Sequence, residues 1–88
     1  MPLTRDSACA LNPQVALRPE PFGALAYHYG NRRLVFLKHP DMVKVVKALA
    51  SHDTVGATLD ACGIAESRQS TFLAALDQLT VSEIINVG

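Results

Sequence analysis

A chain of 88 residues that is 49% hydrophobic and 18% charged suits one small folded domain and is too apolar for disorder. Its 8 basic and 8 acidic residues cancel, which leaves no electrostatic footprint for nucleic acid. Its 2 cysteines lie far apart, which argues against a zinc site or a disulfide framework. No apolar run has the length of a membrane span, and the first residues lack a signal-peptide core. We therefore expect a cytoplasmic protein with free thiols.

The first half of the chain predicts strands. Residues 1–12 are mixed in composition and predict a flexible arm ahead of a single domain over residues 13–88. A short strand over residues 15–18 ends at Pro19-Glu20-Pro21, because proline has no backbone donor. Two further strands, over residues 22–29 and 33–38, follow as a β-hairpin.

Gly30-Asn31 marks the turn of this hairpin, because both residues tolerate the positive φ of tight turns. This turn pairs Tyr27 with Leu34, and a turn at Asn31-Arg32 would pair Tyr29 with Leu34 instead. In both registers the large side chains share one face, since side chains alternate with period two. We expect that face to be the core face of the sheet: Leu25, Tyr27, Tyr29, Leu34 and Phe36.

The opposite face of the hairpin lacks the polar side chains of a solvated sheet. It carries Ala24, Ala26, His28, Arg33, Val35 and Leu37. Two explanations are open for the apolar residues on this face. The N-terminal segment or a helix covers them, or the last strand lies beside a groove for a partner.

Helical patterns fill the second half of the chain. Apolar residues recur at helical spacing in three segments: Met42, Val45, Val46 and Leu49; Val55, Thr58, Leu59 and Cys62; Phe72, Leu73, Leu76 and Leu79. The first helix begins at Pro40, and Asp53 or Thr54 caps the second, which ends at Gly63. Ser67 is the expected cap of the third.

The third helix should run to about Thr80, and residues 82–87 predict either a short strand or an extended tail. The order of elements predicts an α+β fold with a three-stranded antiparallel sheet followed by three helices. Because residues 63–66 join the last two helices at helix-turn-helix dimensions, the whole is winged helix-turn-helix-like.

Nothing in the sequence predicts catalysis. The histidines His28, His39 and His52 lie on separate predicted elements, the carboxylates are scattered, and no Gly-rich loop opens a helix after a strand. We expect a protein that is not an enzyme and carries no cofactor or metal.

Two binding functions stay open on these grounds. The first is DNA binding by a small winged-helix protein. Its DNA contacts would be Arg68, Gln69 and Gln78 on the third helix and Arg32 and Arg33 at the hairpin tip. The neutral charge and the apolar third helix argue against it. An edge strand beside a helix can instead accept an extended peptide as an added strand.

The stretch VALRPEPFGALAYHYGNRRLVFLK, residues 15–38, resembles the small peptide chaperones of mycofactocin biosynthesis. The shared features are an RPEPFGAL segment at 18–25, a Tyr-rich strand with a Gly-containing turn at 27–30, and an R-L-x-F-L-K strand at 33–38. The helical half, residues 40–81, is similar in order, length and apolar spacing. That family is itself similar to the peptide chaperones of pyrroloquinoline quinone biosynthesis, which are recognition elements for ribosomally made, modified peptides.

The resemblance implies a cytoplasmic, non-catalytic adaptor that binds the leader of a mycofactocin precursor peptide and presents it to a radical S-adenosylmethionine maturase. The iron–sulfur clusters and S-adenosylmethionine would belong to that partner, and no nucleic acid or membrane is implied. The leader would add to the third strand, in a cleft with the third helix. The implied peptide-binding residues are Arg33, Leu34, Val35, Phe36, Leu37, Lys38, Arg68, Thr71, Phe72 and Ala75.

Within this set Val35 and Leu37 are the better contact candidates, because their apolar character on that face needs an explanation. Phe36 and Phe72 fit structural roles better. The precursor implied by the resemblance is short and acidic, so basic residues would steer it, an effect that salt weakens. Those residues are Arg32, Arg33, Lys38 and Arg68.

Overall fold

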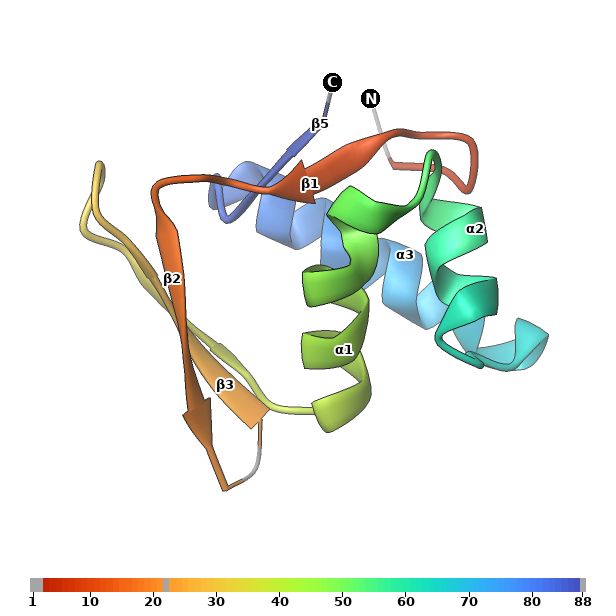
Figure 1. Ribbon diagram of the computed structural model, residues 1–88, viewed down its shortest axis with the longest axis horizontal. Coiled ribbons are helices and arrows are strands. Elements are labelled where there is room, and N and C mark those ends of the chain that lie inside the picture. Colours follow the sequence, from red (N-terminus) through yellow and green to blue (C-terminus); the bar gives the residue numbers. More distant parts are fainter. Residues whose placement is uncertain (1–2, 22, 88) are drawn as a thin grey trace.

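A sheet on one side and a group of helices on the other make up the fold in the computed structural model, which describes residues 3–21 and 23–87 (Figure 1). The elements in chain order are β1 (Cys9–Leu11), β2 (Val15–Glu20), β3 (Gly23–His28), β4 (Leu34–Leu37), α1 (Pro40–Ala48), the 3₁₀ turn η1 (Leu49–Ser51), α2 (Val55–Ala61), α3 (Glu66–Val81) and β5 (Ile85–Val87). Strands β2, β3 and β4 form an antiparallel meander in that order. The predicted α+β class, with its sheet followed by helices, is confirmed.

The register of the hairpin is the one that a turn at Gly30-Asn31 predicts. Tyr27 lies opposite Leu34, and Leu25 lies opposite Phe36. The connection is wider than a two-residue turn, because the last pair of the ladder joins the His28 N–H to the Arg33 carbonyl at 2.9 Å.

A buried histidine organises this wider loop. His28 is only 4% exposed. Its ring nitrogen Nδ1 accepts hydrogen bonds from the N–H groups of Gly30 at 3.0 Å and Asn31 at 3.1 Å. Arg32 takes a positive φ of 61° and donates its N–H to the His28 carbonyl at 2.7 Å. One imidazole therefore replaces the backbone bonds of a tight turn.

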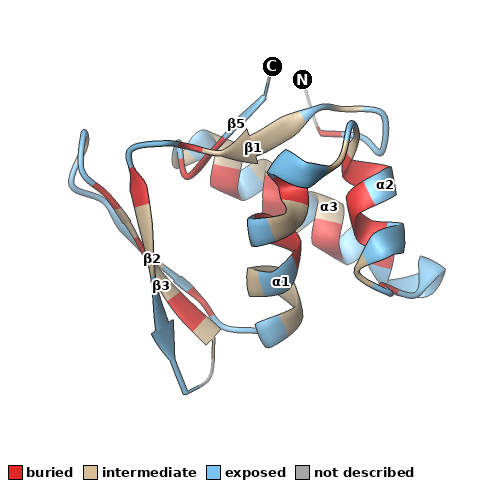
Figure 2. Cartoon of the chain, in the orientation of Figure 1, coloured by how far each residue is buried: buried red, intermediate tan, exposed pale blue. Residues whose placement is uncertain are grey.

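The predicted core face of the hairpin is wrong. The opposite face packs against the helices: Ala24 is 1% exposed, Ala26 is 0% and Leu37 is 4%. Buried and half-buried residues alternate along β3 (Figure 2). Because α1 packs against β3, alanine lets the helix approach the strand closely, whereas tyrosine would hold it off. The large residues expected in the core point the other way: Leu25, Tyr27, Tyr29, Leu34 and Phe36.

The start and stop signals that the sequence gives for the second helix agree with the structure. Thr54 caps α2, its Oγ1 accepting the Ala57 N–H at 3.1 Å, and Gly63 follows that helix with a φ of 73°. Ser67 does not cap the last helix, because α3 runs from Glu66 to Val81 and its N-cap is Ala65, which makes no side-chain cap bond. No helix among the described residues is both long enough and apolar enough to cross a membrane.

The two ends of the chain are joined by a short ribbon. Strand β1 pairs with β5 in antiparallel register, so the C-terminal segment is a strand and not an extended tail. Further out, the Leu3 N–H donates to Asp77 Oδ1 at 3.1 Å, and the Ser7 carbonyl accepts the Val55 N–H at 2.8 Å. Residues 3–11 thus pack on the helices, while the division into arm and domain at residue 12 stays a prediction.

An ion pair near the N-terminus makes stability depend on pH. Arg5 Nη2 lies 2.9 Å from Asp60 Oδ2, and Gln69 Nε2 donates to Asp60 Oδ1 at 3.0 Å. These hydrogen bonds, that from Arg5 first, hold the pKa of the Asp60 carboxyl below its ordinary value of 3.8. The pKa of Asp60 is lower in the folded state than in the unfolded state. The ionised carboxylate therefore stabilises the fold at pH values above the unfolded-state pKa, and this contribution is lost as the pH falls through the folded-state pKa.

We expect Asp60→Asn to lower the melting temperature at neutral pH and to reduce the loss of stability on acidification below about pH 4. Thermal unfolding followed by circular dichroism across that range measures both effects. Asp53→Asn is the matched control, since Asp53 is exposed and forms no ion pair within residues 3–21 and 23–87. Parallel acid curves for Asp60→Asn and the wild type would contradict the assignment.

Candidate functional site

An apolar groove separates β4 from α3. Its volume is about 360 Å³, with one wall from β4 and the other from α3 and the first turn of α1. The lining residues are Val35, Phe36, Leu37, Lys38, Met42, Ala75, Gln78 and Leu79. It lies between the third strand of the meander and α3, where the family resemblance implies a cleft for the leader.

The backbone of β4 is open along the groove. Within the described part of the chain β4 pairs only with β3, which makes it an edge strand. The bond from the His28 N–H to the Arg33 carbonyl fixes the alternation of the antiparallel ladder. Val35 and Leu37 therefore direct their N–H and C=O groups at β3, and Leu34 and Phe36 direct theirs to the open edge. Two residues of β4 therefore turn their backbone groups away from the meander.

The side chains of β4 alternate in the opposite sense. Val35, half-buried, and Leu37, 4% exposed, point to the groove and the core. Leu34 is 60% exposed on the far face of the sheet, and Phe36, 43% exposed, stands at the rim of the groove. Val35 and Leu37 both pack on the hydrophobic core and both line the groove, so the core accounts for their apolar character in part, and a partner in the groove stays a prediction.

The basic residues at the two ends of β4 are both exposed. Lys38 lines the groove, and Arg33 lies at the start of the strand where the hairpin loop ends. Neither side chain forms an ion pair within residues 3–21 and 23–87. The edge of β4 is thus framed by two positive charges.

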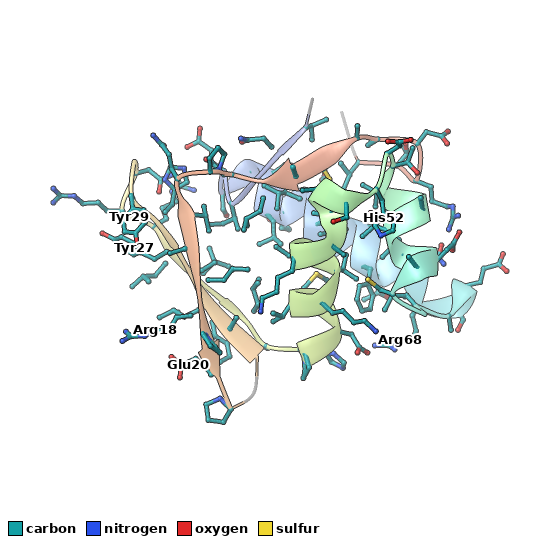
Figure 3. All side chains as sticks on the ribbon, in the orientation of Figure 1. Arg18, Glu20, Tyr27, Tyr29, His52 and Arg68 are labelled. Atoms are coloured by element: carbon teal, nitrogen blue, oxygen red, sulfur yellow. The ribbon has the colours of Figure 1, made fainter. Side chains whose placement is uncertain are left out.

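Only one of the four expected residues on α3 lines the groove, and that is Ala75. Phe72 is 5% exposed and belongs to the core. The Arg68 guanidinium lies 5.1 Å from the centre of the Phe72 ring and pairs with Asp41 at 3.1 Å. Thr71 is exposed outside the groove. In Figure 3 Arg68 lies on the helical side of the molecule, away from the labelled tyrosines of the hairpin.

Three lining residues were absent from the expected set. Gln78 and Leu79 lie three and four positions after Ala75, so extending the helical spacing by one turn would have found them. Met42 comes from α1, and no sequence signal pairs that helix with the edge of β4. Its position depends on how α1 packs, which is a tertiary property.

The cysteines and the possible metal ligands are the remaining candidates for chemistry. Cys9 and Cys62 are unpaired, and burial raises the pKa of the Cys9 thiol, which disfavours the reactive thiolate. Among the residues that the structure describes, no three His, Cys, Asp or Glu side chains are grouped to hold a metal ion.

An α+β domain with an open edge strand beside an apolar groove has the features of a domain that recognises extended peptides. The model of the peptide chaperone MftB family matches residues 8–86. The chain belongs to this family of non-catalytic peptide chaperones of mycofactocin biosynthesis. The predicted resemblance is confirmed.

Three curated relatives are similar over most of their length. The chain is 46% identical to the peptide chaperone MftB of Mycolicibacterium smegmatis over 83 residues, which cover 94% of this chain and 81% of the relative. It is 44% identical to that of Mycobacterium ulcerans and 41% identical to that of Mycobacterium tuberculosis, with 91% of this chain and 73% of each relative covered. No solved structure matches the chain significantly.

Proposed function

We propose that this chain binds the leader of the mycofactocin precursor peptide as an added strand on β4 and presents it to a radical S-adenosylmethionine maturase. The observation that supports this proposal is the open edge of β4, which directs the backbone groups of Leu34 and Phe36 outward beside an apolar groove. Backbone bonds to such an edge give affinity, and the groove beside it selects side chains.

The leader segment that pairs with β4 is short, and its side chains alternate between the two faces of the sheet. Strand β4 has 4 residues, so it pairs with about four residues of leader. In an extended leader every second side chain points to the groove, where it meets Val35, Met42, Ala75 and Leu79. These neighbours call for aliphatic or aromatic side chains at alternate leader positions.

The lining of the groove suits an adaptor that holds a peptide. Its lining consists of apolar side chains with Lys38 and Gln78, none of which is placed to perform redox chemistry. Iron–sulfur clusters and S-adenosylmethionine belong to the cytoplasmic maturase in this proposal. The chain would hold the leader while the C-terminal end of the precursor reaches the enzyme.

Charge frames the groove in a way that suits an acidic leader. We expect Arg33→Glu to slow association with an acidic leader peptide, most strongly at low salt, because the Arg33 charge lies at the end of the open edge. Stopped-flow association rates across a salt series measure this. Lys47→Glu on α1 changes the net charge equally outside the groove and serves as the control. An association rate that ignores both Arg33→Glu and salt rules out steering.

A titration of the isotope-labelled chain with a synthetic mycofactocin precursor peptide tests the proposed function. We expect NMR amide shifts to concentrate on residues 33–38 and 75–79 and on Met42, the positions that frame the groove. Shifts confined to other surfaces would move the leader site away from β4. No shifts with the peptide, together with shifts on a duplex DNA, would favour a DNA-binding winged helix.

No observation favours that alternative at present. Gln69, a candidate base reader, is 6% exposed and donates to the Ile64 carbonyl at 3.1 Å. The Arg68 guanidinium is held by Asp41. Two of the three polar side chains that α3 offers to DNA are thus already engaged within the protein.

A further inference from the structure

Residues 3–7, which we call the N-terminal strap, lie beside the start of α2 (Figure 1). Two carbonyl oxygens of the strap accept the N–H groups of Val55 and Gly56, each at 2.8 Å. These N–H groups are the first two donors of α2, and the Thr54 hydroxyl accepts the third. A helix cannot pair its first N–H groups internally, so the strap completes this end of α2.

The side chain of Arg5 joins the strap to both helices. Its guanidinium pairs with Asp60 of α2 at 2.9 Å, and it also donates to the side-chain oxygen of Gln69 on α3. Gln69 is only 6% exposed. Its amide nitrogen donates to Asp60 at 3.0 Å and to the carbonyl of Ile64, in the turn between the two helices, at 3.1 Å. Because a buried polar group needs all its partners, this network fixes α2 and α3 relative to each other.

The surface of α2 leaves room for this side chain. A Cβ added at Gly56 would lie 3.0 Å from each of three guanidinium atoms of Arg5, which are Cζ, Nε and Nη2. A larger residue at this position would therefore push the guanidinium away from Asp60 and Gln69. Glycine is otherwise a poor residue within a helix, because it loses more backbone freedom on folding than alanine does. The close approach of Arg5 gives this glycine a role.

The strap holds α3 on the side opposite the groove. The residues of α3 that face the strap are spaced by four and form one stripe along the helix: Gln69, Leu73 and Asp77. Asp77 accepts the Leu3 N–H at 3.1 Å, and Leu73 lines the same surface hollow as Arg5. Ala75, which lines the groove, lies two positions from both Leu73 and Asp77. Two positions are about 200° around a helix, so the strap and the groove lie on opposite sides of α3.

We propose that the N-terminal strap sets the position of α3 relative to β4, and so the width of the groove, with Arg5 as the positioning residue. A strand that enters the groove pushes α3 away from β4, and the strap resists this movement from the other side. A groove wall that is fixed before binding loses less freedom on binding, which favours affinity. The inference rests on the proposed function where it concerns the leader, whereas the position of α3 in the free protein does not depend on it.

Arg5→Ala tests the inference in the full chain. The Arg5 side chain is half-exposed, so folding should be retained, which circular dichroism checks. In the free protein we expect NMR amide shifts at residues 75–79, on the far side of α3, as well as at the neighbours of Arg5. Lower global stability alone does not move the amide shifts of the folded state. We expect the affinity for a synthetic mycofactocin precursor peptide to fall about fivefold in isothermal titration calorimetry.

Arg18→Ala is the matched control. Arg18 is an exposed arginine on β2 and forms no ion pair within the part of the chain that the structure describes. Its replacement should change neither the amide shifts at residues 75–79 nor the affinity for the peptide.

Gly56→Ala reaches the same contact from α2. The added methyl group displaces the guanidinium, so we expect the shifts at residues 75–79 that Arg5→Ala gives. In the double variant Arg5→Ala, Gly56→Ala the methyl group meets no guanidinium, and the shifts should be no larger than in Arg5→Ala alone. Larger shifts in the double variant would show that Gly56 acts on α3 without Arg5, which contradicts the inference.

Amide shifts in Arg5→Ala that stay on α2 and around Gln69 overturn the inference. Peptide affinity equal to that of a peptide-binding wild type, in a variant whose residues 75–79 do shift, overturns it as well. If residues 75–79 shift while the wild type binds no peptide, the strap positions α3 and the proposed function fails.

Discussion

Replacing Phe36 by proline is expected to weaken leader binding by about tenfold or more while the sheet itself stays paired. The N–H of Phe36 points to the open edge of β4 and not to β3, so the substitution removes a donor that only the leader would use. Proline is tolerated on edge strands at such outward positions. Isothermal titration calorimetry with the synthetic precursor peptide measures the loss.

Phe36→Ala is the matched control for this experiment. It removes the same aromatic ring from the rim of the groove but keeps the N–H, so the difference between the two variants reports the backbone bond. Equal affinities for Phe36→Pro and Phe36→Ala would show that the leader does not bond to this edge. Val35→Pro would be a poor test, because its N–H faces Ala26 and its loss would disrupt the hairpin itself.

Gly23→Ala is expected to destabilise the protein toward the upper end of the roughly 1–3 kcal/mol that forced overpacking costs. A Cβ at Gly23 would lie 1.8 Å from the Leu37 carbonyl oxygen and 2.9 Å from its carbon. These are backbone atoms of β4, so the hairpin must part at this end to make room. Urea unfolding followed by circular dichroism gives the free energy of unfolding.

Gly63→Ala separates this collision from ordinary backbone strain. Gly63 has a φ of 73°, but a Cβ there would meet nothing within 4 Å. Its alanine variant should therefore lose only the ~1 kcal/mol that a left-handed residue costs. Equal losses in the two variants would mean that β3 and β4 absorb the added methyl group without parting. Because Leu37 also lines the groove, we further expect Gly23→Ala to weaken leader binding.

The order of the three meander strands and the three helices was predictable because each of these elements is encoded locally, whereas β1 lies in the segment expected to be a flexible arm. Helical spacing, the Thr54 cap and the Gly63 stop mark α2, and the hairpin register follows from the position of Gly30-Asn31. Which face of the hairpin is buried was not predictable in this way. Residue size pointed to the tyrosines, but the approach of α1 selected Ala24 and Ala26, and that packing is set by elements distant in sequence.

The candidate site, like the fold, was predictable only in part. The four residues from Val35 to Lys38 lie together because they adjoin in sequence, and Ala75 joins them at the groove. Phe72 and Arg68 share helical spacing with Ala75, yet Phe72 is drawn into the core and Arg68 to Asp41. A spacing rule identifies residues on one side of a helix, but not where a groove on that side ends.

The ribbon of β1 and β5 has a consequence for how the chain folds. It joins Cys9 to Val87 and Leu11 to Ile85, so nearly the whole chain must be closed into a loop before these bonds form. Such distant pairings carry the full entropy of loop closure and are slow to nucleate. We therefore expect the ribbon to close after the folding barrier, so that weakening it speeds unfolding and leaves the folding rate nearly unchanged. The lifetime of the folded state, rather than the speed of reaching it, would then depend on this pairing.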